Sequence, residues 1–243
     1  AAGVVNVVVT TPGGDSPASA ADEFTYAPTP TVTSVSPAAG PSGGGNTVTI
    51  AGTGLTGATA VKFGASNARS SATQITATVP AGSGIVDVTV TTAGGTSSVS
   101  VADKYSYVPA PAVTGISPAS GPTAGGTSVV ITGSNLTAAS AVRFGGTAAS
   151  SFTLDSGTQI TATAPAGAVG AVDVTVTTVG GTSTTHAGDL FSYVAAPTVT
   201  GVSPATGPVA GGSTVTITGT ALTGATAVKF GSTNATSFIV DSA

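Results

Sequence analysis

The chain has 243 residues and a formal net charge of −4, and only 6% of its residues are charged, against about 25% in a typical soluble domain. Its five basic residues are too few for the Lys and Arg patch that displaces counterions from nucleic acid, so we expect no nucleic-acid partner. The absence of Cys excludes disulfides and thiolate metal sites.

Strand-forming and turn-forming residues dominate the composition. Val and Ala supply most of the 40% hydrophobic content, Thr and Ser supply most of the polarity, and there are 35 Gly and 15 Pro. Val and Thr favour strands, whereas Gly and Pro favour turns. No apolar run approaches the length of about 18 residues that a membrane-spanning helix needs. The start, Ala1 to Val5, lacks the basic region of a secretory signal. We therefore expect an all-β chain with no membrane insertion in this segment.

Three segments of the chain read almost alike, and each leads into the motif Gly-Pro-x-x-Gly-Gly: Pro30–Pro37, Pro111–Pro118 and Pro197–Pro204. Pro118 follows Pro37 by 81 positions, and Pro204 follows Pro118 by 86. A period this long holds several strand-like runs, so it predicts a row of small domains rather than a solenoid of minimal units.

The chain begins and ends within a repeat. Residues 1–28 match the last strands of a preceding repeat, 29–108 and 109–195 are complete repeats, and 196–243 match the first strands of a following one. We therefore expect a window of a longer polypeptide, with a native mass above 22.5 kDa. In the alternative arrangement, the tail of one molecule completes the head of the next. That arrangement would lack the strand equivalent to Thr158–Pro165 and would expose sheet edges.

Alternating side chains predict strands with one buried face within each repeat. Val172, Val174 and Val176 would point inward, with Asp173 and Thr175 pointing outward. The same alternation recurs at the equivalent positions of the other copies.

Turn and aromatic residues complete the expected domain. Val142 and Phe144 share a face, Gly180-Gly181 reads as a hairpin turn, and the aromatic pair Phe191 and Tyr193 would close the core. Seven or so short strands in about 85 residues predict a two-sheet antiparallel sandwich of immunoglobulin-like form.

A longer shared run carries a family resemblance. The pattern Pro-x-x-Gly-Pro-x-x-Gly-Gly-x-x-Val-x-Ile-x-Gly-x-x-Leu covers Pro37–Leu55, Pro118–Leu136 and Pro204–Leu222, followed by Ala-Val-x-Phe-Gly and a final Phe/Tyr-x-Tyr. This run resembles IPT/TIG domains, the immunoglobulin-like fold of plexins and some transcription factors. The resemblance implies an early-set sandwich but no activity, because members bind DNA, bind proteins or act as spacers beside catalytic domains. The DNA-binding members use basic loops, which this chain lacks.

His186 is the only histidine, and Ser100 and Ser19 occupy the equivalent positions. We interpret it as a solvated loop residue, for which His186→Ala would be nearly neutral. Catalysis needs an oriented base beside a nucleophile or a second carboxylate, and no such set recurs. We therefore expect no enzyme activity, with no catalytic residue, no cofactor-binding residue and no metal site.

Three acids occupy one position of the repeat. Asp22, Asp103 and Asp189 each precede the final Tyr by four residues. Such a carboxylate could cap a turn by accepting backbone N–H groups. The alternative is a share in a Ca²⁺ site between domains, but calcium takes six to eight oxygens and no neighbouring acid recurs. Turn capping is the favoured interpretation.

The remaining acids have plain structural interpretations. Asp87 and Asp173 are expected on a solvated strand face, where Asn6 replaces them in the first fragment. Asp155 and Asp241 fall in an inserted loop, where Asp-Ser reads as a turn signal.

Two further patterns are weak. Lys62 and Lys229 raise the idea of an intramolecular isopeptide bond, but the equivalent Arg143 cannot form one. Asn135 and Asn234 each begin a glycosylation triplet, which matters only with the right host machinery.

Short proline-bearing linkers at 27–30, 108–111 and 194–197 favour stiff joints and a rod. The sequence thus predicts a structural or adhesive segment of an extracellular or cell-surface fibre, stalk or filament, with neighbouring copies as its partners. The alternative is a non-catalytic accessory region of a secreted polysaccharide-active enzyme, with a cell-surface or carbohydrate partner. The absence of Trp and the presence of only four Tyr count against sugar stacking.

Overall fold

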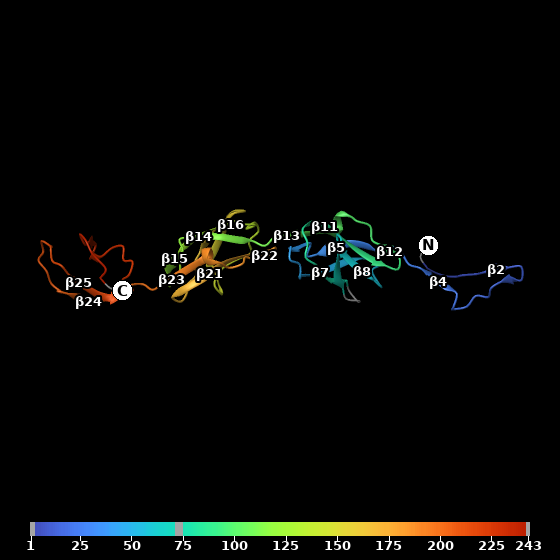
Figure 1. The fold of residues 1–243 in the computed structure, drawn as a ribbon, viewed down its shortest axis with the longest axis horizontal. Helices are drawn as coiled ribbons and strands as arrows, with labels where there is room; N and C mark the ends of the chain where they lie inside the picture. The colour runs from blue at the N-terminus through green and yellow to red at the C-terminus, as the bar shows by residue number, and fades with distance from the viewer. Residues whose placement is uncertain (1–2, 71–74, 242–243) are drawn as a thin grey trace.

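The computed structural model describes residues 3–70 and 75–241, and its units follow one another along the long axis of the molecule (Figure 1). The two inner units are complete β-sandwich repeats, each with its own cluster of buried side chains drawn from residues 32–107 or from residues 113–193. The two cores share no residue. The expected row of β-sandwich domains, arranged end to end, is confirmed.

Short strands make up almost all of the regular structure. The first unit holds β1 (Gly3–Asn6), β2 (Thr10–Thr11), β3 (Gly14–Asp15) and β4 (Glu23–Tyr26). The first complete repeat holds β5 (Thr31–Ser36), β6 (Ala39–Pro41), β7 (Thr47–Thr53), β8 (Ala60–Phe63), β9 (Ser66–Ser70), β10 (Thr76–Thr78), β11 (Gly84–Thr92), β12 (Gly95–Thr96), the 3₁₀ turn η1 (Val101–Asp103) and β13 (Lys104–Val108).

The later units use the same elements. The second complete repeat holds β14 (Ala112–Ser117), β15 (Ser120–Pro122), β16 (Ser128–Ser134), β17 (Ala141–Phe144), β18 (Thr147–Ala148), β19 (Ser151–Ser156), β20 (Gln159–Thr163), β21 (Gly170–Thr178), β22 (Gly181–Thr182), η2 (Ala187–Asp189) and β23 (Leu190–Val194). The last unit holds β24 (Thr198–Ser203), β25 (Thr216–Thr220), β26 (Lys229–Phe230) and β27 (Thr233–Asn234).

The second complete repeat forms the predicted two-sheet sandwich. One sheet has the strand order β14-β16-β20-β19, and the other has the order β15-β23-β21-β17-β18 with β22 paired to β21. In the first complete repeat, β9 pairs with both β8 and β10 and joins the two layers into one continuous path. In the second repeat, the corresponding stretch is longer and is divided between β18 and β19, so the layers stay separate.

The inserted segment of the second repeat is a strand, so the loop expected around Asp155 is wrong. Phe152 pairs with Ala162 and Leu154 with Ile160 along β19 and β20. Phe152 packs against the core cluster, and this contact makes the segment follow the sheet. The turn comes after Ser156 instead, because Ser156 pairs with Gln159.

One strand pair in each complete repeat is parallel, which differs from the purely antiparallel expectation. Gly40 of β6 pairs with Tyr107 of β13, and Gly121 of β15 pairs with Tyr193 of β23. A Cβ added at Gly121 would lie 2.9 Å from Cζ of Phe191, so the chain can approach the closing strand only with glycine there. The first glycine of the repeated motif is therefore a packing requirement.

The predicted inward face is the observed core. Val174 and Val176 have no exposed surface, and Val142 and Phe144 are 2% exposed. The ring of Phe144 meets that of Phe191 edge to face, with centroids 5.2 Å apart.

Replacing Phe144 by Ala should destabilise its repeat by about 3–5 kcal/mol, because a fully packed ring leaves a cavity when it is removed. That loss approaches the whole stability of a small domain. Urea unfolding of segment 109–195 measures it, with exposed Thr153→Ala as the control. A midpoint that shifts no more than the control's would show that this face is not the core.

Candidate functional site

The three recurring acids cap the turn that precedes each closing strand, as the sequence predicted. The Oδ2 atom of Asp103 accepts the backbone N–H of Ser100 at 2.7 Å. Asp189 accepts that of His186 at 3.1 Å, and Asp22 repeats the contact at the start of the chain. These bonds hold η1 and η2 in place, so that β13 and β23 enter the core in the same register.

His186 is exposed, as expected of a solvated residue, but its side chain also caps η2. Its Nδ1 accepts the backbone N–H of Gly188 at 2.8 Å, as Ser100 Oγ accepts that of Ala102 in the other repeat. Its Nε2 contacts the carbonyl oxygen of Val113, which assigns the ring hydrogen to Nε2. Both ring nitrogens are thus used on the backbone. The ring therefore has no free nitrogen to act as a base.

Several other charged residues make contacts at the surface. Asp87 forms an ion pair with Lys104, whose hydrogen bond holds the pKa of the Asp87 carboxyl below its usual value. Asp155 accepts a hydrogen bond from Thr161 Oγ1 at 2.7 Å. Arg143 donates to the Gly146 carbonyl at 2.8 Å.

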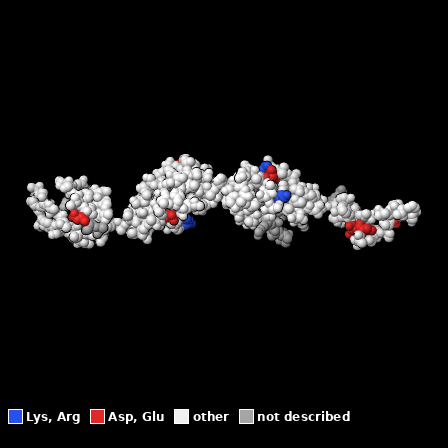
Figure 2. All heavy atoms as spheres, in the orientation of Figure 1, with Lys and Arg blue, Asp and Glu red and all other residues white. Residues whose placement is uncertain are grey.

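The remaining residues that the sequence analysis considered as possible sites lie at the surface. Lys62, Lys229, Asp241 and Asn234 are exposed. Within residues 3–70 and 75–241, no three His, Cys, Asp or Glu side chains gather as a metal site would require. On the face drawn in Figure 2, charged side chains are few and lie in small groups among neutral ones.

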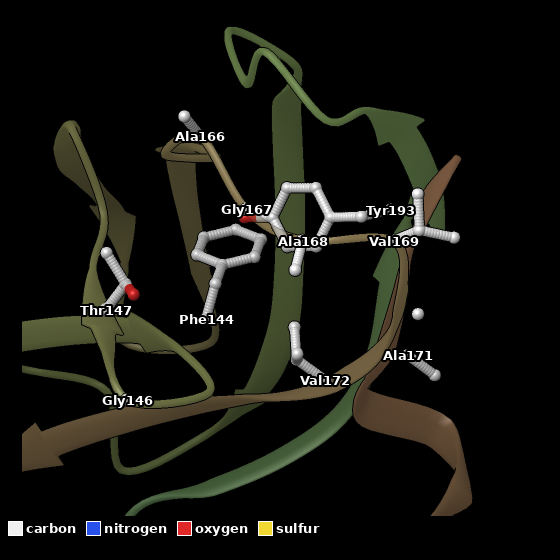
Figure 3. A pocket seen from close by; sticks show the side chains of 11 residues that line it. Phe144, Gly146, Thr147, Ala166, Gly167, Ala168, Val169, Ala171, Val172 and Tyr193 are labelled. Atoms are coloured by element: carbon white, nitrogen blue, oxygen red, sulfur yellow. The ribbon is translucent and has the colours of Figure 1, made fainter. Parts of the chain in front are cut away.

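The hollow at the end of the second repeat is small and uncharged. It measures about 210 Å³ and lies beside Phe144, Tyr193, the loop 166–169 and the start of β21, as Figure 3 shows. The Tyr193 hydroxyl donates to the Pro165 carbonyl at 2.9 Å. The lining residues include no acid, histidine or lysine.

The most specific geometry lies where each repeat meets the linker before it. A Cβ added at Gly180, in the turn between β21 and β22, would lie 2.0 Å from the Pro109 carbonyl oxygen. Gly94 meets the Pro28 carbonyl in the same way, and the hydroxyl of Thr29 donates to the Gly94 carbonyl at 3.3 Å. The hairpin turn is thus pressed against the linker in both complete repeats.

A second contact holds the linker between the complete repeats from another side. The side-chain amide of Asn135 donates to the Ala110 carbonyl at 3.0 Å. Asn135 has φ of 55°, the left-handed conformation that Gly54 and Ala221 adopt at the equivalent positions. The asparagine of this glycosylation triplet is therefore engaged in a structural contact.

The fold and its joints define a tandem immunoglobulin-like β-sandwich protein. The model of the family described as "IPT/TIG domain" matches residues 30–107, 111–193 and 197–243. The chain belongs to the IPT/TIG domain family, and the resemblance read from the sequence is confirmed.

Three solved structures illustrate what the chain is similar to. The full extracellular region of plexin A4 is 26% identical, with 72% of this chain and 16% of that chain covered and a TM-score of 0.46. SGBP-B, from a complex xyloglucan utilization locus in Bacteroides uniformis, is 19% identical, with 64% and 48% covered and a TM-score of 0.30. Invasin, a bacterial integrin-binding protein, is 16% identical, with 83% and 48% covered and a TM-score of 0.27.

The chain spans less than half the length of each of these three structures. A comparison with curated proteins found no match. No helix in the described ranges has the length and apolar character needed to cross a membrane.

Replacing His186 by Ala should lower the stability of the second repeat by about 0.5–2 kcal/mol, because the N-cap of η2 loses its acceptor. His186→Ser should recover most of that loss, since Ser100 performs the same task in the other repeat. Denaturant midpoints of segment 109–195 test both changes. Equal midpoints for the Ala variant and the unmodified protein would show that the cap contributes nothing.

Proposed function

We propose that this chain is a non-catalytic structural segment of an extracellular or cell-surface fibre, stalk or filament, in which the repeats act as stiff spacers. The observation that carries the proposal is the contact between each hairpin turn and the linker before it, at Gly94 with Pro28 and at Gly180 with Pro109. A flexible tether would leave the linker free of its domain. Here the linker has backbone-to-backbone contact and proline at the joint, and both limit rotation.

The surface chemistry supports a spacer rather than a site for a charged ligand. Only 6% of residues are charged, and threonine hydroxyls pair across neighbouring strands, as Thr31 does with Thr53 and Thr177 with Thr182. Such pairs stabilise sheets modestly and carry no net charge. A neutral surface also permits neighbouring copies to lie close together without repulsion, which suits self-association in a fibre.

The aromatic residues argue against a sugar-binding platform in the complete repeats. Tyr105, Tyr107, Phe191 and Tyr193 are at most 5% exposed. Their rings serve the core, so they are not available to stack on a sugar. A spacer role therefore has more support than a carbohydrate-binding role in this segment.

Pulling the chain by its two ends tests the proposed mechanical role directly. Complete repeats 29–108 and 109–195 should each unfold as one cooperative unit, releasing about 26 nm and about 29 nm of extended chain before subtraction of their folded lengths. Single-molecule force spectroscopy measures these steps. Extension without discrete force peaks would contradict a load-bearing role.

The joint itself is tested by Gly180→Ala, because the added Cβ would collide with the Pro109 carbonyl oxygen. Nitroxide labels on Ser66→Cys and Thr153→Cys, in a chain without native Cys, report the distance between the complete repeats. We expect one narrow distance distribution that shifts or broadens in the variant. Gly146→Ala, where a Cβ meets nothing within 4 Å, is the control. A broad distribution in the unmodified chain would refute the stiff joint.

A further inference from the structure

Each capping acid has one carboxyl oxygen without a hydrogen-bond partner. Asp103 and Asp189 have no exposed surface, and each uses Oδ2 to hold its turn. The other oxygen, Oδ1, is buried and receives no hydrogen bond, and the same holds for Asp22. Buried polar atoms are rarely without a partner, and here the same atom lacks one at three equivalent positions.

A second carboxyl group lies beside this acid on the neighbouring strand. Asp173 of β21 pairs in register with Leu190, the residue after Asp189, and its carboxyl group lies within hydrogen-bond reach of Asp189. Asp87 stands in the same relation to Asp103 in the other complete repeat. Two carboxylates this close cannot both remain ionised without cost.

The other copies have different residues beside the capping acid. In the first complete repeat, Asp87 forms an ion pair with Lys104, so a cation offsets the two acids. In the first unit, Asn6 occupies the position of Asp87, so no second acid stands at that position, although the Oδ1 atom of Asp22 still receives no hydrogen bond. The second complete repeat has neither the lysine nor the asparagine, because Leu190 stands at the position of Lys104 and Asp173 at the position of Asn6.

Besides Asp173, the titratable group against the turn of the second repeat is His186, whose charge lowers the pKa of the Asp189 carboxyl. The elements packed on η2 are β14, which carries no ionisable residue, and β21, which supplies Asp173. The turn itself adds only His186, whose ring nitrogens are used on the backbone of Gly188 and Val113.

We propose that Asp173 and Asp189 form a proton-binding site, in which one proton taken from water is held between the two carboxyl groups. Binding changes the charge of the pair from −2 to −1 and supplies the hydrogen that the buried Oδ1 atom lacks. Two carboxyl groups are too few for calcium, which takes six to eight oxygens. The site adjoins β23, which continues into the linker at Val194, so proton binding strengthens the attachment of the strand that leads to the next unit.

The electrostatics agree with this geometry. Burial is the largest influence and raises the pKa of the Asp189 carboxyl. The hydrogen bond from His186 N–H and the charge of His186 lower this pKa, and the Asp173 carboxyl raises it. An acid with a raised folded-state pKa contributes stability at low pH that is lost as the pH rises through that pKa. Asp87 has a lowered pKa, so its contribution is lost as the pH falls. Acid should therefore affect the two complete repeats in opposite directions through these pairs.

Carbon-13 NMR of the carboxyl groups in the full chain tests the proposal, because the chain has only nine acidic residues. The Asp189 signal should show a titration step above the ordinary range of aspartate. A single step in the ordinary range would overturn the proposal. This measurement needs no variant.

Asp173→Asn copies the arrangement at Asn6 and supplies the second arm of the test. The upper titration step of Asp189 should disappear, and the second repeat should no longer gain stability on acidification. Asp155→Asn removes the same charge from the same repeat and should leave the upper step in place. Loss of the step in both variants, or in neither, would contradict a specific pair.

Leu190→Lys supplies the cation found at Lys104 and should move the upper step of the pair to lower pH. Addition of millimolar CaCl₂ separates a proton from a metal ion. A rise in the melting temperature with calcium that vanishes in Asp173→Asn would assign the pair to a cation and overturn the proposal. No effect of calcium on the melting temperature supports the proton.

Discussion

Three aromatic rings packed edge to face hold each complete repeat together, and the other conserved spacings of the repeat depend on them. In the second repeat, the ring centroid of Phe191 lies 5.2 Å from that of Phe144 and 5.0 Å from that of Tyr193. Such contacts add about 0.5–1.5 kcal/mol each beyond the burial of the rings. Because so few residues are aromatic, this one cluster carries much of the packing that fixes how the two sheets meet.

The ring cluster explains the glycine that opens each motif. Gly40 and Gly121 lie against the rings in the parallel strand pair, and a Cβ at Gly40 would come within 2.2 Å of the Tyr105 hydroxyl oxygen. The strand that carries two of the three rings is positioned by the capped 3₁₀ turn before it and continues into the proline linker after it. Core, turn and joint are therefore consecutive parts of one stretch of chain, and a change in one is transmitted to the others.

This arrangement suits a protein with almost no charge. Exposed ion pairs contribute little to stability in any protein, and Asp87 with Lys104 is a partly exposed pair of this kind. Stability must come from apolar burial, cross-strand threonine pairs and backbone hydrogen bonds. The few buried acids are then costly, and their recurrence at Asp103 and Asp189 indicates a specific use in holding the turn.

The sequence by itself determined the all-β class, the repeats, the inward faces and the capping acids, because these depend on local alternation and on spacing along the chain. Val174, Phe144 and Asp189 all lie where those patterns predicted. The tertiary structure decided what depends on partners distant in sequence. Phe152 turned an expected loop into a strand by packing on the core, and the second ring nitrogen of His186 contacts Val113, 73 positions away. The parallel pairing at Gly121 and the contact of Asp173 with Asp189 were likewise hidden, because a one-dimensional pattern shows which face a side chain takes but not which side chain lies opposite it.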